Sequence, residues 1–89
     1  MLTKKVTIVN KLGLHARAAA KFVSHASHYE SEAYLIKGND RANGKSIMSV
    51  MLLAASHGTE LELQTTGKDE VEMMQDLEKL IQEKFGESE

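Results

Sequence analysis

Apolar and polar residues alternate strictly over residues 60–65 of this chain, and no other feature constrains the fold as much. The segment reads ELELQT, so Leu61 and Leu63 fall on one side of an extended strand, and Glu60 and Glu62 fall on the other. Such alternation is typical of an antiparallel sheet that is packed on one face and solvated on the other. Similar short segments bounded by turn residues predict three further strands, at residues 4–9, 32–37 and 40–43.

Two segments between these strands carry helical spacing instead. Residues 16–27 are rich in alanine, and the face that we expect to be buried comprises Ala16, Ala19, Ala20, Val23 and Ala26. Residues 47–55 form a short and almost wholly apolar block, with Ser46 positioned as the N-cap of a second helix.

A last helix is expected after Gly67, which ends the strand before it. Asp69 and Glu72 have the spacing of a capping box at its start. Its apolar stripe consists of Met74, Leu77 and Ile81, flanked by Met73 and Leu80. We expect the residues after Phe85 to fray.

The resulting order, β-α-β-β-α-β-α, predicts an α+β fold. The simplest arrangement is an open-faced β-sandwich, a four-stranded antiparallel sheet with three helices on one face. Tyr34 and Ile36 fall on the open face and are its apolar exceptions. No repeat, linker or composition shift divides the chain, so we expect residues 1–89 to form a single domain.

Composition excludes several classes of protein. The 89 residues contain no cysteine, which leaves no disulfide framework and no thiolate metal site. No apolar run approaches the roughly 20 residues that cross a bilayer, and the first residues do not resemble a signal peptide. Aromatic residues make up only 4% of the chain and the net charge is −2, so no nucleic-acid surface is expected. We expect a cytoplasmic monomer with no membrane insertion.

The segment NKLGLHARAAAKF, residues 10–22, places His15 after a glycine-containing loop and directly before a helix. The first backbone amides of a helix lack partners and attract anions, and Arg17 adds a fixed cation beside them. A neutral imidazole next to such an anion site suits phosphoryl transfer. Because the chain offers no second acid–base pair and no nucleotide-binding loop, we expect a carrier without stand-alone catalysis and without a cofactor.

Other interpretations of the histidines are open at this point. A single histidine near the start of a helix is often an ordinary surface residue. His25 and His28 are three residues apart and could share a helix face, and with His57 they define an alternative, a metal-binding module. No convincing third ligand accompanies the pair, so we expect no metal site.

Two motifs together resemble the HPr family of histidine-containing phosphocarrier proteins. They are NKLGLHARAAAKF at residues 10–22 and NGKSIMSVMLLAA at residues 43–55, and the resemblance extends over the whole chain. It implies a protein of the phosphoenolpyruvate-dependent phosphotransferase system. His15 would accept a phosphoryl group from enzyme I through Nδ1 and pass it to a histidine of a IIA protein.

The resemblance also assigns roles to the neighbours of His15. Arg17 would hold the phosphoryl oxygens, and the backbone amides of Ala16 and Arg17 would cap the phosphate. One departure lies inside the motif, because Ala18 stands where the family most often has proline. Proline fixes φ in a first helical turn, so alanine should loosen the preorganisation without removing a chemical group.

The second motif implies regulation and docking. Ser46 resembles the serine that a bifunctional HPr kinase/phosphorylase modifies in some members, which would place negative charge on the partner-binding surface. The block that follows is apolar around most of its circumference, so part of it must be exposed. The docking surface for enzyme I and IIA proteins is expected to comprise Ile47, Met48 and Met51, with Leu14 and Ala16 as neighbours.

A second function class fits the same residues. The chain could be a regulatory interaction module of the nitrogen branch of the family, in which phosphorylation controls the binding of a regulator or a metabolic enzyme. The sequence does not separate this alternative from a role in sugar uptake.

Overall fold

Four strands and three helices follow one another in the predicted order in the computed structural model, which describes residues 1–89. They are β1 (Leu2–Thr7), α1 (Ala16–Ala26), β2 (Glu32–Lys37), β3 (Asp40–Asn43), α2 (Ile47–Leu52), β4 (Glu60–Thr66) and α3 (Glu70–Gln82), followed by a short turn, η1 (Lys84–Gly86). The first strand begins and ends two residues earlier than predicted, because the residues that pair with residues 60–65 of β4 are residues 2–7. No helix combines the length and the apolar composition needed to span a bilayer.

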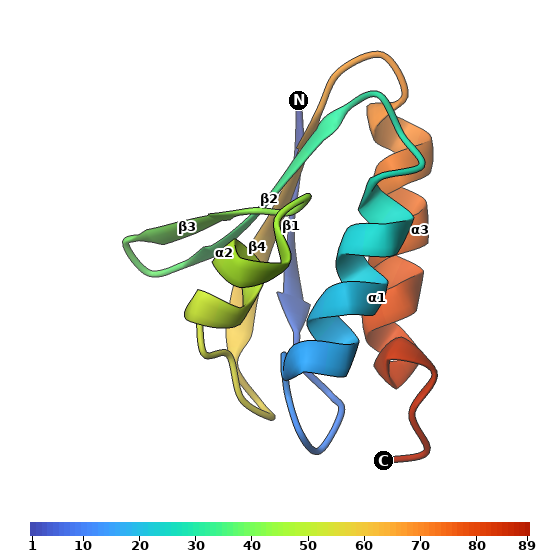
Figure 1. Ribbon diagram of the computed structural model, residues 1–89. Helices are drawn as coiled ribbons and strands as arrows, with labels where there is room; N and C mark the ends of the chain where they lie inside the picture. The colour runs from blue at the N-terminus through green and yellow to red at the C-terminus, as the bar shows by residue number, and fades with distance from the viewer.

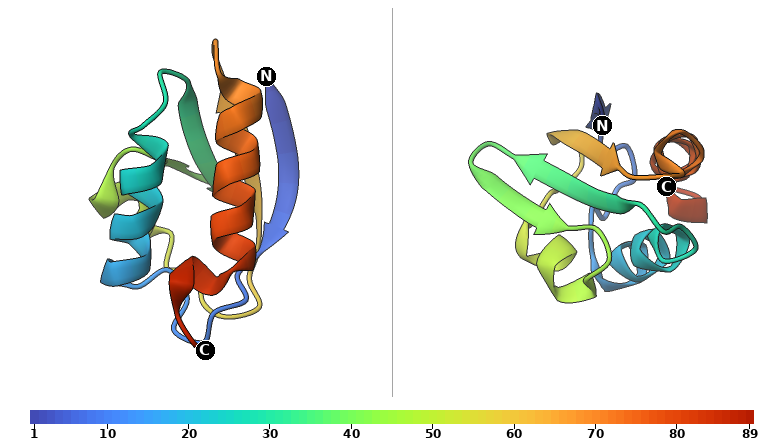
Figure 2. Two further views of the ribbon diagram at one scale, coloured as in Figure 1. Left: turned by 90° about the vertical axis from the view of Figure 1, so that its right-hand side faces the viewer. Right: turned by 90° about the horizontal axis from the view of Figure 1, so that it is seen from above.

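The sheet has the strand order β1-β4-β2-β3, and every neighbouring pair is antiparallel. On the central strand β4, Leu61 lies opposite Val6 of β1 and Leu63 lies opposite Leu35 of β2. Residues two apart in a strand point to the same side, so these side chains form one apolar face. All three helices cover that face (Figures 1 and 2). The predicted α+β open-faced sandwich is confirmed.

Twenty-one buried apolar residues form one cluster between the sheet and the helices. α1 contributes Phe22 to its centre. The predicted apolar stripe of the last helix is confirmed, since Met73, Met74, Leu77, Leu80 and Ile81 are all buried. Burial of side chains of this size contributes roughly 1.5–3 kcal/mol each to folding.

Tyr34 and Ile36 lie half-buried on the open face, as predicted. Arg41 lies opposite Ile36 in the β2–β3 hairpin, and its guanidinium carbon is 3.8 Å from the centre of the Tyr34 ring. This cation–π contact covers part of the aromatic ring that would otherwise face water.

The predicted inner face of the first helix is partly wrong. Ala16 and Ala20 are exposed and Val23 is half-buried, whereas Ala18 and Phe22 are fully buried. Alanine fits either side of a helix, so its spacing alone does not decide the rotation. Phe22 has the largest apolar surface on the helix, and its burial turns Ala18 inward with it.

The predicted capping box at the start of α3 is also wrong. Asp69 precedes the helix, but its carboxylate accepts no hydrogen bond from the first turn. It accepts instead from the Ser31 hydroxyl at 2.5 Å, from the Ser31 amide at 2.9 Å and from the Glu30 amide at 3.1 Å. These bonds, led by that of the Ser31 hydroxyl, lower the pKa of Asp69 from 3.8 to about 2. Asp69 therefore ties α3 to the segment between α1 and β2.

The chain does not fray after Phe85, contrary to the prediction. Residues 83–89, termed the C-terminal strap, fold back to the loop before α1, and Figure 1 shows the C-terminus beside that loop. The amide of Lys11 donates to the carbonyl of Glu89 at 2.6 Å, and Lys21 Nζ donates to the carbonyl of Phe85 at 2.9 Å. The buried Phe85 side chain anchors the strap to the core.

Candidate functional site

One side-chain and one backbone hydrogen bond hold the loop between β1 and α1. Asn10 is fully buried, and its Nδ2 donates to the carbonyl of Gly13 at 2.8 Å. The amide of Leu14 donates to the carbonyl of Ala55 at 2.9 Å, which ties the loop to the segment after α2. Gly13 has a φ of +68°, and a Cβ there would lie 2.5 Å from the Ala55 oxygen. Only glycine fits this approach, and it fixes where the next two residues lie.

His15 is the N-cap residue of α1. Its backbone is extended, with φ −74° and ψ 178°, and its side chain makes no capping hydrogen bond. The first intrahelical bond runs from the amide of Ala19 to the carbonyl of His15, so the amides of Ala16, Arg17 and Ala18 have no partner. Three free donors at the positive end of a helix dipole form an anion site next to the imidazole.

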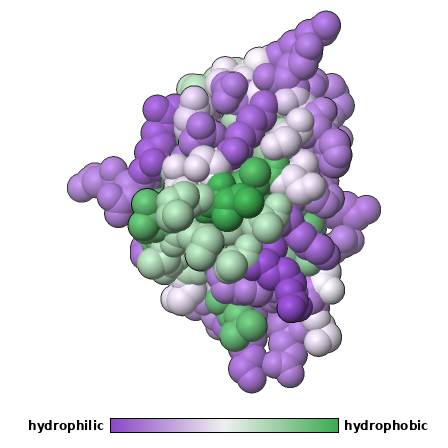
Figure 3. Space-filling view, in the orientation of Figure 1, coloured by the Kyte–Doolittle hydropathy of each residue, from purple (hydrophilic) through white to green (hydrophobic).

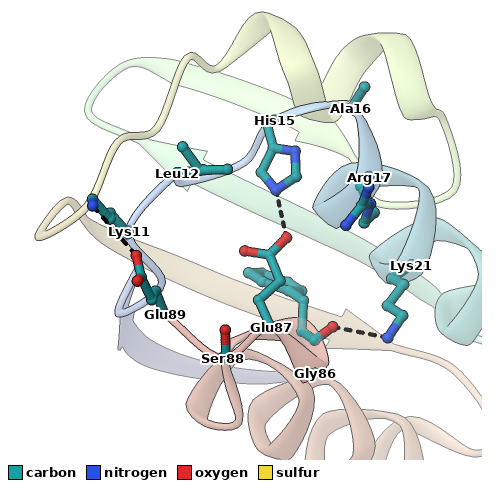
Figure 4. A pocket seen from close by; sticks show the side chains of 11 residues that line it. Lys11, Leu12, His15, Ala16, Arg17, Lys21, Gly86, Glu87, Ser88 and Glu89 are labelled. Carbon is teal, nitrogen blue, oxygen red and sulfur yellow. Dashed lines mark hydrogen bonds and ion pairs between the residues drawn. The ribbon is translucent and has the colours of Figure 1, made fainter.

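The two ring nitrogens of His15 have different surroundings. Nε2 lies 2.5 Å from Oε2 of Glu87, whose carboxylate points up from the C-terminal strap toward the ring (Figure 4). Nδ1 has no hydrogen-bond partner. An ionised carboxylate can only accept a hydrogen bond, so in the neutral ring Nε2 carries the proton and Nδ1 carries the free electron pair.

The Glu87 carboxylate is itself held in place. Nδ2 of Asn10 donates to Glu87 Oε1 at 3.0 Å, which leaves Oε2 for His15. Burial acts to raise the pKa of Glu87, but the hydrogen bonds from Asn10 and His15 and the charges of His15 and Arg17 outweigh it, and the pKa lies below its usual value. Glu87 is therefore ionised at neutral pH.

An open hollow of about 920 Å³ lies between the loop, the first turn of α1 and the strap, and three cationic side chains line it. Lys11 pairs with Glu89 at 3.3 Å, and Lys21 binds the Phe85 carbonyl. Arg17 makes no hydrogen bond or ion pair and lies beside His15 (Figure 4). It is the one cation of this hollow that has no partner and is free to bind an anion.

A second candidate surface lies on α2. The predicted residues Ile47, Met48 and Met51 are exposed, and so is Leu52, which was not predicted. These four residues are termed the α2 patch, and Figure 3 shows apolar surface over α2. α2 contacts α1, and Ala16 at the start of α1 is exposed as expected.

Leu14 does not belong to this exposed surface, contrary to the prediction. Only 5% of Leu14 is exposed, because the bond of its amide to Ala55 draws it into the core. Ser46 caps α2 as predicted, with its Oγ accepting from the amide of Ser49 at 3.3 Å.

The histidines of the metal-binding alternative do not converge. His25 Nδ1 lies 3.0 Å from Oδ1 of Asp76, and the rings of His25 and His28 meet edge to face. His57 does not join them, and no group of three side chains is arranged to hold a metal ion. Asp76 also accepts from the Tyr29 hydroxyl at 2.8 Å, which helps to raise the pKa of Tyr29 to about 12. This cluster therefore joins α1 to α3.

Sequence reasoning missed two residues of the site, Asn10 and Glu87. They are 77 residues apart, and no local pattern links them. The available signal was Asn10 itself, a polar residue directly after an apolar strand and before a glycine loop. For Glu87 there was none, because a charged residue near a chain end is ordinarily solvated.

Comparison with known proteins decides the family. The model of the family described as "PTS HPr component phosphorylation site" matches residues 2–83. The chain belongs to the HPr family. This confirms the resemblance seen in the two motifs, and with it the assignment as a phosphocarrier protein of the phosphotransferase system.

Individual HPr proteins agree with this assignment over the full length. The phosphocarrier protein HPr of Neisseria meningitidis serogroup A is 53% identical over 89 residues, which is 100% of both chains. The crystal structure of HPr-C-His from Thermoanaerobacter tengcongensis has a TM-score of 0.95 and 44% identity, again over 100% of both chains. An HPr dimer from the same organism has a TM-score of 0.78 and 45% identity, over 98% of this chain and 100% of that one. The monomeric state of the present chain stays a prediction.

Proposed function

We propose that this HPr protein accepts a phosphoryl group from enzyme I, with phosphoenolpyruvate as the original donor, on Nδ1 of His15 and passes it to a histidine of a IIA protein. One observation carries the proposal. Nδ1 of His15 has no partner and stands at a helix start where three backbone amides are also free.

The transfer needs few groups from this chain. The electron pair on Nδ1 attacks phosphorus, the N–P bond forms, and the bond from phosphorus to the donor atom breaks with its electrons leaving on the donor. The helix amides and Arg17 stabilise the charge on the phosphoryl oxygens. Delivery to the IIA histidine runs the same step in reverse, with Nδ1 as the leaving group.

The partners supply what the carrier lacks. The hollow beside His15 is open to solvent and holds no second general acid or base aimed at Nδ1, so the rest of the transfer site must come from enzyme I or the IIA protein. We infer that the α2 patch docks these partners, because it is apolar, exposed and carried by a helix in contact with α1. Methionine side chains adapt to different partner surfaces.

Regulation at Ser46 is a further part of the proposal. The Ser46 hydroxyl is half-buried at the start of α2 and directly precedes Ile47 and Met48. A phosphate there would add about −1.5 to −2 charge beside the α2 patch. We expect an HPr kinase/phosphorylase to modify Ser46 and thereby to weaken docking of enzyme I. We also place this carrier in the cytoplasm, where its partners act.

Intact-mass analysis tests the transfer after mixing with phosphoenolpyruvate and a catalytic amount of enzyme I. We expect one acid-labile phosphoryl group on the wild type and none on His15→Ala. Arg17→Ala should slow labelling by a factor on the order of a hundred, since it removes a charged donor to the transferred group. His57→Ala, which alters an exposed histidine in a turn, is the matched control and should label like the wild type. Normal labelling of His15→Ala would refute the proposal.

A further inference from the structure

We propose that Glu87 is a positioning residue for phosphoryl transfer: its carboxylate, held by Asn10, fixes the proton of His15 on Nε2, aims Nδ1 at the anion site, and balances the positive charge that the ring acquires. This inference rests on the proposed function. It concerns a residue beyond the part of the chain that matches the family model, which ends at residue 83.

The geometry gives Glu87 two different partners, one for each oxygen. Oε1 accepts from Nδ2 of the fully buried Asn10 at 3.0 Å, and Oε2 lies 2.5 Å from Nε2 of His15. Nδ2 of Asn10 also donates to Gly13 in the loop that leads to His15. The same buried amide therefore holds both the carboxylate and the loop that carries the imidazole.

The contact is partly shielded from water. The side chains of His15 and Glu87 are 27% and 15% exposed, so their interaction is screened less than an ordinary surface ion pair. Phe85, two residues earlier, is buried, and Lys11 and Lys21 hold the strap on both sides of Glu87 (Figure 4). These contacts hold the strap in place, and the carboxylate has little freedom to leave the ring.

The contact between Glu87 and Nε2 stabilises the charge that the His15 ring acquires during the transfer. When Nδ1 forms its bond to phosphorus, the proton stays on Nε2 and the ring becomes an imidazolium. A carboxylate at Nε2 stabilises that cation and keeps the proton off Nδ1 beforehand, as a buried carboxylate does for the histidine of a hydrolase triad. Glu87 lies at the far end of the ring from the anion site, so it need not touch the phosphoryl oxygens.

The first test requires no phosphoryl donor. ¹⁵N NMR of the neutral ring reports which nitrogen of His15 carries the proton. We expect Nε2–H in the wild type and a mixture of both tautomers in Glu87→Ala. Glu83→Ala is the matched control, since it removes another strap carboxylate, one that is exposed and whose side chain makes no hydrogen bond or ion pair, and it should leave the wild-type tautomer. A proton on Nδ1 in the wild type, or equal populations in wild type and Glu87→Ala, would overturn the proposal.

The second test measures the initial rate of labelling by phosphoenolpyruvate and enzyme I. We expect Glu87→Ala to be slower by about tenfold or more, and Glu83→Ala to stay within about twofold of the wild type. Glu87→Gln keeps the shape without the charge and should also be slow. An unlabelled wild type would refute the carrier function itself, whereas a wild-type rate in Glu87→Gln or Glu87→Ala would refute only the role of Glu87. The backbone NMR spectrum shows that each variant is folded.

Discussion

His15 owes its expected reactivity to contacts at both ends of its ring. The helix amides and Arg17 lie at the Nδ1 side, and the Asn10–Glu87 pair lies at the Nε2 side. An isolated neutral imidazole has no strong preference for carrying its proton on one nitrogen rather than the other. The hydrogen bond that one nitrogen makes therefore determines which nitrogen is protonated and which keeps its electron pair. Asn10 and Glu87, which are 77 residues apart, thus act together on one ring nitrogen.

Asp69 makes a different kind of contribution, to stability alone, and its pH dependence can be predicted. Hydrogen bonds from Ser31 and Glu30 lower the pKa of Asp69 to about 2 in the folded protein, against 3.8 for the free group. A lowered pKa means that the stabilisation is complete above pH 3.8 and is lost as the pH falls toward 2. We expect Asp69→Asn to be less stable than the wild type at pH 7, and the difference to narrow between pH 3.8 and 2.

Urea unfolding of both proteins at several pH values measures this difference. Asp40→Asn is the control, because the Asp40 side chain is exposed in the β2–β3 hairpin and makes no hydrogen bond or ion pair. The stability difference between Asp40→Asn and the wild type should not follow the pH dependence expected for Asp69→Asn. If the difference in the free energy of unfolding between Asp69→Asn and the wild type stayed constant from pH 7 to pH 2, the bonds from Ser31 and Glu30 could not depend on the ionised carboxylate.

Among the elements, α2 has the least local support. It is six residues long, has no acidic residue in its first turn, and buries only Val50. Isolated helices of this length are not stable in water, so its cap and its packing must hold it. We expect Ser46→Ala to lower the free energy of unfolding by about 1 kcal/mol. Aspartate can still cap the helix, so Ser46→Asp should lower the free energy of unfolding by only a few tenths of a kcal/mol.

Chemical denaturation checks this prediction, with Ser49→Ala as the matched control. Ser49 takes part in the cap through its backbone amide only, and Ser49→Ala keeps that amide. Loss of the Ser49 hydroxyl should therefore change the free energy of unfolding by less than about 0.5 kcal/mol. Equal stability of Ser46→Ala and the wild type would show that the contact seen at 3.3 Å contributes nothing to folding.

The elements also show what local sequence patterns can and cannot predict. Strand alternation places Leu61 and Leu63 correctly because one face of the sheet packs against the helices and the other faces water. The rotation of α1 was partly wrong because its alanines fit either side, and only Phe22 distinguishes the faces. The capping box failed because Asp69 bonds to Ser31, 38 residues away, rather than to its own helix. Local pattern fixes the type of element; long-range polar contacts are set by the assembled fold.

At the scale of the whole molecule, the fold brings the end of the chain to the start of its first helix. The strap makes its turn through Lys84 and Phe85, which have φ values of +60° and +56°. Such conformations cost on the order of 1–3 kcal/mol each in residues other than glycine. Burial of Phe85 and the bonds of the strap to Lys11, Lys21 and Asn10 offset that cost.

Because the strap reaches the first helix only in the folded chain, a role for His15 could be proposed from the sequence, whereas a role for Glu87 could not. The site needs a loop, a helix start and a chain end that lie together only after the sheet has formed. The motif around His15 carries its own local signal, the free amides of a helix start. The partner of Nε2 is supplied by the tertiary fold alone.

We expect His15 to react through Nδ1 because Glu87 engages Nε2. NMR of the ¹⁵N-labelled protein after phosphorylation by phosphoenolpyruvate and enzyme I tests it most directly, through the coupling between ³¹P and the ring nitrogens. We expect a phosphorus coupled to Nδ1 of His15, with the proton retained on Nε2. A phosphoryl group on Nε2, or on any residue other than His15, would contradict it.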